Sequence, residues 1–71
     1  MEYVPVSSST IAAVAYDPES ATLGVRFHTG AEYHYFQVPR GVFDGFFTAS
    51  SCGAYLDQYV KKAGYQYARV G

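Results

Sequence analysis

The sequence has one cysteine, no tryptophan, few charged side chains and no long apolar run. Because Cys52 is the only thiol, an intramolecular disulfide and a cysteine-held zinc site are both excluded. No stretch reaches the about 20 apolar residues that a membrane-spanning helix needs. Residues 1–6 also lack the basic and apolar regions of a signal peptide. We therefore expect a cytoplasmic chain with no membrane partner, since a lone free thiol suits a reducing compartment.

Charge of either sign is scarce, with charged residues making up 15% of the chain and a net charge of −1. So little charge beside 18% aromatic residues argues against disorder. The absence of a positive field argues against a dedicated nucleic-acid binder, which normally carries one. Near neutrality also gives little electrostatic protection against self-association.

Aromatic residues are what the sequence has in plenty: eight tyrosines and five phenylalanines among 71 residues. A chain of this length forms one domain, which we assign to residues 1–71. Short chains bury a small share of their surface, so their cores must be dense. Aromatic rings bury a large area each and can close such a core.

The first half of the chain has the pattern of β-strands. An apolar run at 10–16 ends at residues 17–20, where Asp17 and Pro18 favour a turn. Residues 22–28 alternate between apolar and polar, and 31–38 form a third extended run. Short turns join these segments, which predicts a three-stranded antiparallel meander.

The second half has the spacing of helices. Pro39 ends the strands and suits a first helical turn. One apolar stripe then falls at Val42, Phe43, Phe46 and Phe47, and a second falls at Tyr55, Leu56, Tyr59 and Val60. Ser50 or Ser51 is the expected cap of the second helix, and Gly64 its stop. The predicted fold is α+β, with two helices packed on one sheet face and a short extended segment at 65–70.

The loop at 29–30 decides which face the central tyrosines occupy. A two-residue loop would place Tyr33 and Tyr35 opposite the face of Leu23, Val25 and Phe27. A three-residue loop with Gly30 at positive φ places all five on one face, and we favour it because it collects one core-facing layer. The other face would then carry Arg26, His28, His34 and Phe36. Ile11 and Val14 are three positions apart, so in a regular strand their side chains would face opposite sides of the sheet. This indicates a bulge or an apolar outer face in the first strand.

Several short motifs resemble the KTSC domain, in an order and spacing that cover roughly residues 6–67. They are residues 6–11, Tyr16-Asp17, residues 23–27, the Tyr33-His34-Tyr35 signature, Val38-Pro39, Ala49-x-Ser51-x-Gly53 and residues 65–67. The domain is named for its place at the C-terminus of some lysyl-tRNA synthetases, and it also exists as a free-standing bacterial protein. The resemblance implies a small domain without an established activity, for which the synthetase association suggests RNA binding. A shared fold does not transfer a function.

Two groups of residues are candidates for RNA binding. Arg26, His28, His34 and Phe36 would combine phosphate-binding charge with a stacking ring, although an ordinary solvated face is the favoured interpretation. A second positive patch is formed by Lys61, Lys62 and Arg69, which we interpret first as partners of a helix C-terminus. Tyr33 and Tyr35 could stack bases, but core walls are the favoured interpretation.

No catalytic or metal site is predicted. His28, Glu32 and His34 make a weak metal pattern, and we expect no metal and no cofactor. Cys52 and the serines at 7–9 have no general base at helpful spacing, so we expect no enzyme and no small-molecule substrate. The remaining hypothesis is a binding module for RNA or tRNA-like ligands. The alternative is a protein-interaction or homodimerisation module without nucleic-acid binding.

Overall fold

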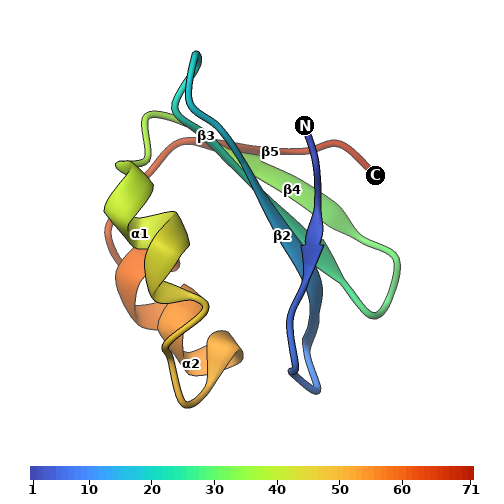
Figure 1. The fold of residues 1–71 in the computed structure, drawn as a ribbon. Helices are drawn as coiled ribbons and strands as arrows, with labels where there is room; N and C mark the ends of the chain where they lie inside the picture. The colour runs from blue at the N-terminus through green and yellow to red at the C-terminus, as the bar shows by residue number, and fades with distance from the viewer.

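The computed structural model describes residues 1–71 as a five-stranded antiparallel sheet with its helical segments on one side (Figure 1). The spatial order of the strands follows the sequence: β1 (Val4–Pro5), β2 (Ile11–Asp17), β3 (Thr22–Phe27), β4 (Glu32–Tyr35) and β5 (Tyr67–Arg69). The α+β class is confirmed, but the prediction of three strands is wrong. Strand β1 has two residues, which is too short to give an alternating pattern, whereas β5 lies within the extended segment expected at 65–70 and adds a strand to the sheet.

The β3–β4 hairpin has the register that the aromatic pattern favours. Val25 lies opposite Tyr33, and Leu23 lies opposite Tyr35, so these four side chains share one face. The Phe27 amide donates to the Ala31 carbonyl at 2.8 Å, which closes a three-residue loop. In that loop Gly30 has a φ of +95°, a conformation that strongly favours glycine.

Strand β2 contains a β-bulge, one of the two alternatives that the positions of Ile11 and Val14 indicate. Ile11 pairs with Phe27, whereas Ala13 pairs with Arg26, so one extra residue is accommodated between them. This β-bulge returns both Ile11 and Val14 to the interior, where each is fully buried.

The helical layer consists of three short segments: α1 (Arg40–Gly45), α2 (Cys52–Leu56) and a π-helical turn, η1 (Asp57–Lys61). Ser51 caps α2 by accepting a hydrogen bond from the Ala54 amide at 3.2 Å. The second predicted helix is therefore present, but its latter half is wider than an α-helix. The chain leaves this turn through Gly64, whose φ is +84°.

The core joins the sheet to the helical segments. Its ten buried side chains are Ile11, Val14, Leu23, Val25, Tyr35, Val38, Phe46, Cys52, Leu56 and Val60. Leu23 and Val25 are fully buried, which confirms their inward orientation, and the half-buried Phe27 packs against this cluster. Phe47 is 47% exposed, so only part of the first predicted apolar stripe is buried. No helix has the length and apolar character needed to cross a bilayer.

Candidate functional site

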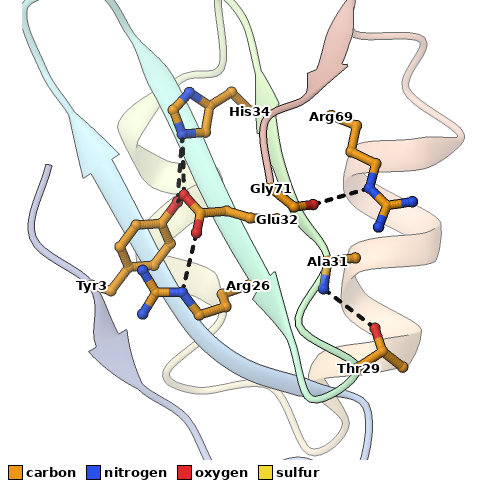
Figure 2. A network of polar contacts seen from close by, with 8 residues as sticks. All are labelled: Tyr3, Arg26, Thr29, Ala31, Glu32, His34, Arg69 and Gly71. Carbon is orange, nitrogen blue, oxygen red and sulfur yellow. Dashed lines mark hydrogen bonds and ion pairs between the residues drawn. The ribbon is translucent and has the colours of Figure 1, made fainter.

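The sheet face opposite the core carries a network of four polar side chains, Tyr3, Arg26, Glu32 and His34 (Figure 2). The Tyr3 hydroxyl donates to Glu32 Oε2 at 2.8 Å and lies 3.5 Å from His34 Nε2. Arg26 Nε donates to Glu32 Oε1 at 3.2 Å. The Arg26 guanidinium also stacks on the Tyr3 ring, 4.1 Å from its centroid. The N-terminal segment thus covers part of the face predicted to be open.

The electrostatics of this network compensate the positive charge of Arg26. The hydrogen bond from Tyr3, aided by Arg26, lowers the pKa of Glu32 below its ordinary value. Partial burial, together with the bond to Glu32, raises the pKa of Tyr3 to about 12. Glu32 is therefore a carboxylate paired with Arg26 at neutral pH. An arginine held in this way has less to offer a phosphate group than a free one.

Gly24 makes room for the N-terminal segment. A Cβ atom at this position would lie 2.5 Å from the Tyr3 hydroxyl and 2.8 Å from the Met1 sulfur. The absence of a side chain at the centre of β3 is what lets the Tyr3 ring lie close to the sheet.

The other two members of the predicted strip lie apart from this network. His28 Nε2 makes a 2.8 Å hydrogen bond with the Ser8 carbonyl. Phe36 follows β4, is 38% exposed and lies beside a different hollow, described below. His28 therefore does not join Glu32 and His34, and no group of three potential ligands could hold a metal ion.

A cleft between the sheet and the helical layer is lined mainly by tyrosines. This tyrosine cleft has a volume of about 360 Å³ and is lined by Phe27, Tyr33, Tyr35, Lys61, Tyr65 and Tyr67. Tyr33 and Tyr35 come from β4, Tyr67 from β5 and Lys61 from the end of η1. Register explains the grouping, because Tyr67 pairs with Tyr35 and so shares its face of the sheet.

The rings of the cleft pack against one another. The ring centroids of Tyr35 and Tyr67 are 5.6 Å apart, those of Tyr33 and Tyr67 are 6.0 Å apart, and Phe27 meets Tyr33 edge-on at 5.9 Å. Tyr35 is buried, and this burial, with the neighbouring Tyr33 and Tyr67, raises its pKa. Tyr67, in contrast, is 63% exposed and presents its ring to solvent. The cleft thus has a fixed wall and an accessible ring.

Two of the three basic residues in the second predicted patch, Lys61 and Arg69, lie at or beside this cleft. Lys61 lines it, with Nζ 6.0 Å from the Phe27 ring centroid. Arg69 is paired with Tyr33 across the β4–β5 ladder, and its Nε donates to the Gly71 carbonyl at 3.0 Å (Figure 2). Lys62 lies at the end of η1, 3.9 Å from Asp57 Oδ2. The structure therefore brings Lys61 and Arg69 to Tyr33 and Tyr35, and places Arg26 and His34 on the opposite face.

Sequence reasoning missed Tyr3, Tyr65 and Tyr67 as site residues. The alternation of Tyr65, Tyr67 and Arg69 was a usable signal, since an added edge strand would place these side chains beside β4. Tyr3 gave no such signal, because it precedes a two-residue strand.

The remaining candidates have structural roles. The Cys52 thiol is buried and donates to the Phe46 carbonyl at 3.4 Å. Ser8 Oγ accepts hydrogen bonds from the amides of Thr10 and Ile11, both at 3.1 Å.

A short antiparallel sheet, a helical layer on one side and an aromatic cleft between them define a small α+β domain. The profile of the KTSC domain matches residues 7–67, and the chain belongs to this family. The crystal structure of a KTSC domain protein from Yersinia pestis matches with a TM-score of 0.89 and 33% identity, covering 99% of this chain and 97% of that one.

Two curated relatives resemble the chain over most of its length. A protein from Tsukamurella paurometabola is 46% identical over 57 residues, which cover 80% of this chain and 85% of that protein. An uncharacterized protein from Stutzerimonas stutzeri is 37% identical over 70 residues, 99% of each chain. Neither name denotes an enzymatic activity.

Proposed function

We propose that this KTSC domain is a non-catalytic binding module that holds single-stranded RNA in the tyrosine cleft. The single observation that carries the proposal is the exposed Tyr67 ring beside Lys61, at the mouth of a cleft walled by Tyr33 and Tyr35. Aromatic side chains bind single-stranded nucleic acid because every base has a face to stack on. A cation beside the ring attracts the phosphate that accompanies each base.

The cleft is large enough to admit a base. Its volume of about 360 Å³ falls within the range of small-ligand sites, roughly 300–1,000 Å³. The wall is pre-formed by the buried Tyr35, so binding would order few side chains and lose little entropy.

The distribution of charge along the chain also favours RNA binding by the C-terminal region. Three of the five basic residues lie at Lys61, Lys62 and Arg69, whereas Asp57 is the only acidic side chain after Asp44. The net charge of −1 thus hides a positive C-terminal region. A lone buried thiol, Cys52, accords with a cytoplasmic location, which is part of the proposal.

Fluorescence anisotropy with a labelled single-stranded RNA tests the proposal. Tyr67→Ala should weaken binding about tenfold, the effect typical of one lost stacking contact. Tyr59→Ala is the matched control, because Tyr59 is 53% exposed but does not line the cleft. Arg26→Ala should leave affinity unchanged, since Arg26 lies on the opposite face. Absence of RNA binding at low salt would overturn the proposal.

Salt dependence adds a second measurement. The affinity should fall as salt rises, because phosphate contacts release counterions. In Lys61→Ala the slope of log affinity against log salt should be less steep by roughly 0.7, the value for one contact with a single strand. An unchanged slope would show that Lys61 does not contact phosphate.

The competing proposal is a protein-interaction or homodimerisation module. It is favoured by large apolar side chains left exposed: Met1, Val4, Phe36, Phe47, Tyr59, Tyr67 and Val70. Sedimentation at increasing protein concentration tests self-association. A monomer at every concentration would exclude the homodimer, and RNA binding by that monomer would favour the tyrosine cleft.

A further inference from the structure

A second hollow adjoins the tyrosine cleft. It has a volume of about 360 Å³ and is lined by Phe36, Gln37, Gly64, Tyr65 and Gln66. Tyr65 also lines the tyrosine cleft, so the two hollows meet at this ring. Two aromatic residues and two glutamines therefore line a space next to the proposed base-stacking site.

Gln37 has a backbone conformation that its residue type disfavours. Its φ is +56°, in the left-handed region where glycine and asparagine are usual. Backbone hydrogen bonds on both sides hold it there: the Phe36 amide donates to the Gln66 carbonyl, and the Val38 amide donates to the Ala21 carbonyl, both at 2.8 Å. The Tyr16 hydroxyl further anchors this segment by donating to the Val38 carbonyl at 2.6 Å.

Gln37 lines the hollow, and the hydrogen bonds on both sides fix its backbone. Glycine would satisfy the same backbone without strain, but it has no side chain to offer. Strained residues held by their surroundings are concentrated at ligand-binding positions. Gln37 and Gln66 are both exposed, and each amide has a donor next to an acceptor.

The amide offers a donor beside an acceptor, which matches the Hoogsteen edge of adenine. A glutamine amide pairs bidentately with the N6 amino group and the N7 atom of adenine. The rings of Phe36 and Tyr65 supply stacking surfaces beside the amides. Neither uracil nor cytosine has this Hoogsteen edge.

We propose that the hollow at Gln37 is a subsite that reads adenine in the nucleotide next to the one stacked in the tyrosine cleft. This inference rests on the proposed RNA binding and adds sequence selectivity to it. The tyrosine cleft and Lys61 supply affinity for any base, whereas Gln37 discriminates between bases.

Anisotropy titrations with short oligoadenylate, oligouridylate and an oligonucleotide of 7-deazaadenosine test the subsite. The 7-deaza base keeps its stacking surface but lacks N7. The protein should bind oligoadenylate about tenfold more tightly than either of the others, the discrimination typical of one bidentate contact.

Gln37→Gly is the informative variant, because glycine accepts the positive φ and the fold is retained. This variant should bind all three oligonucleotides equally, at the affinity that the unaltered protein has for oligouridylate. Gln58→Ala removes an exposed amide elsewhere, on η1, and should keep the preference for adenine.

The outcomes separate the two proposals. Equal binding of all three oligonucleotides by the unaltered protein would overturn the adenine subsite while leaving RNA binding in place. A preference that survives Gln37→Gly would also overturn it. Failure to bind any oligonucleotide would overturn RNA binding itself, and the subsite with it.

Discussion

At Tyr3, a single hydroxyl connects the N-terminal segment to the centre of the sheet. It donates to Glu32, and the ring of the same residue carries the Arg26 guanidinium. Glu32 is thereby shared between a phenol and a guanidinium, both of which favour its ionised form. One residue outside the predicted strands therefore decides how the outer face is organised.

The Tyr3 hydroxyl should contribute measurably to stability. We expect Tyr3→Phe to lower the free energy of unfolding by about 1 kcal/mol at neutral pH, the net worth of one hydrogen bond. Urea denaturation measures this difference. Tyr59→Phe is the control, because the Tyr59 hydroxyl belongs to an exposed ring away from the network. Equal stability of Tyr3→Phe and the unaltered protein would contradict the expectation.

The effect of Tyr3→Phe should depend on pH through Glu32. The pKa of Glu32 is lowered in the folded chain, so its contribution is present above its ordinary pKa and is lost as pH falls through the folded value. The difference between the two proteins should therefore shrink in acid. A difference that stays constant into strong acid would show that the carboxylate is not involved.

At the scale of elements, the helical layer depends on caps and packing more than on length. Segments α1 and α2 have six and five residues, and helices this short are marginal in isolation. Cys52, Leu56 and Val60 attach α2 and η1 to the core, and Ser51 satisfies one free amide at the start of α2. The cap is therefore a local interaction that can be removed without opening the core.

Removal of this cap gives a prediction for the element. Ser51→Ala should lower the free energy of unfolding by about 1 kcal/mol, because the Ala54 amide loses its acceptor. Ser50→Ala provides the comparison, since Ser50 precedes the cap and should have little effect. Thermal or urea unfolding monitored by circular dichroism distinguishes the two. Equal losses in both variants would show that Ser51 does not act as the cap.

The strands show which elements can be read from the sequence. Strands β2, β3 and β4 were predicted, because seven, six and four residues give recognisable patterns. The observed hairpin register is the favoured one of two, and the observed bulge is one of the two alternatives left open for the first strand. Strand β1 was missed because it is two residues long and contains Pro5. Its pairing with Val14 and Ala13 arises only once β2 exists.

At the scale of the whole molecule, tyrosine hydroxyls are spread through a structure that has no disulfide. Burial, with the bond to Glu32, raises the pKa of Tyr3 to about 12. Burial also raises the pKa of Tyr35, and it raises that of Tyr55, whose hydroxyl donates to the Val42 carbonyl at 2.8 Å. These groups make stability sensitive to alkaline conditions.

The direction of this pH effect follows from the linkage between protonation and folding. A group whose pKa is raised in the folded state contributes stability below its unfolded pKa, here 10.0, and this is lost as pH rises toward the folded value. We therefore expect the midpoint of thermal unfolding to fall steadily above pH 10, and Tyr3→Phe to reduce that dependence. Melting curves across the alkaline range measure it. A midpoint independent of pH there would contradict the three raised pKa values.

The sequence by itself indicated the α+β class, the family, a shared face for Leu23, Val25, Tyr33 and Tyr35 as the favoured hairpin register, and a cap of the second helix at Ser50 or Ser51. These features depend on the spacing of apolar residues, on the alternation of side chains along a strand and on residues that favour turns or caps. All of these act between near neighbours in the chain. Only the tertiary structure decided that Tyr3 joins Arg26 and Glu32 on the outer face, and that Tyr67 completes a cleft with Tyr33 and Lys61. The pairs Tyr3–Glu32, Tyr33–Tyr67 and Tyr33–Lys61 are each more than 25 positions apart in the sequence. Local patterns hold no information about such distances, because side-chain contacts between distant segments are set only when the whole sheet has formed.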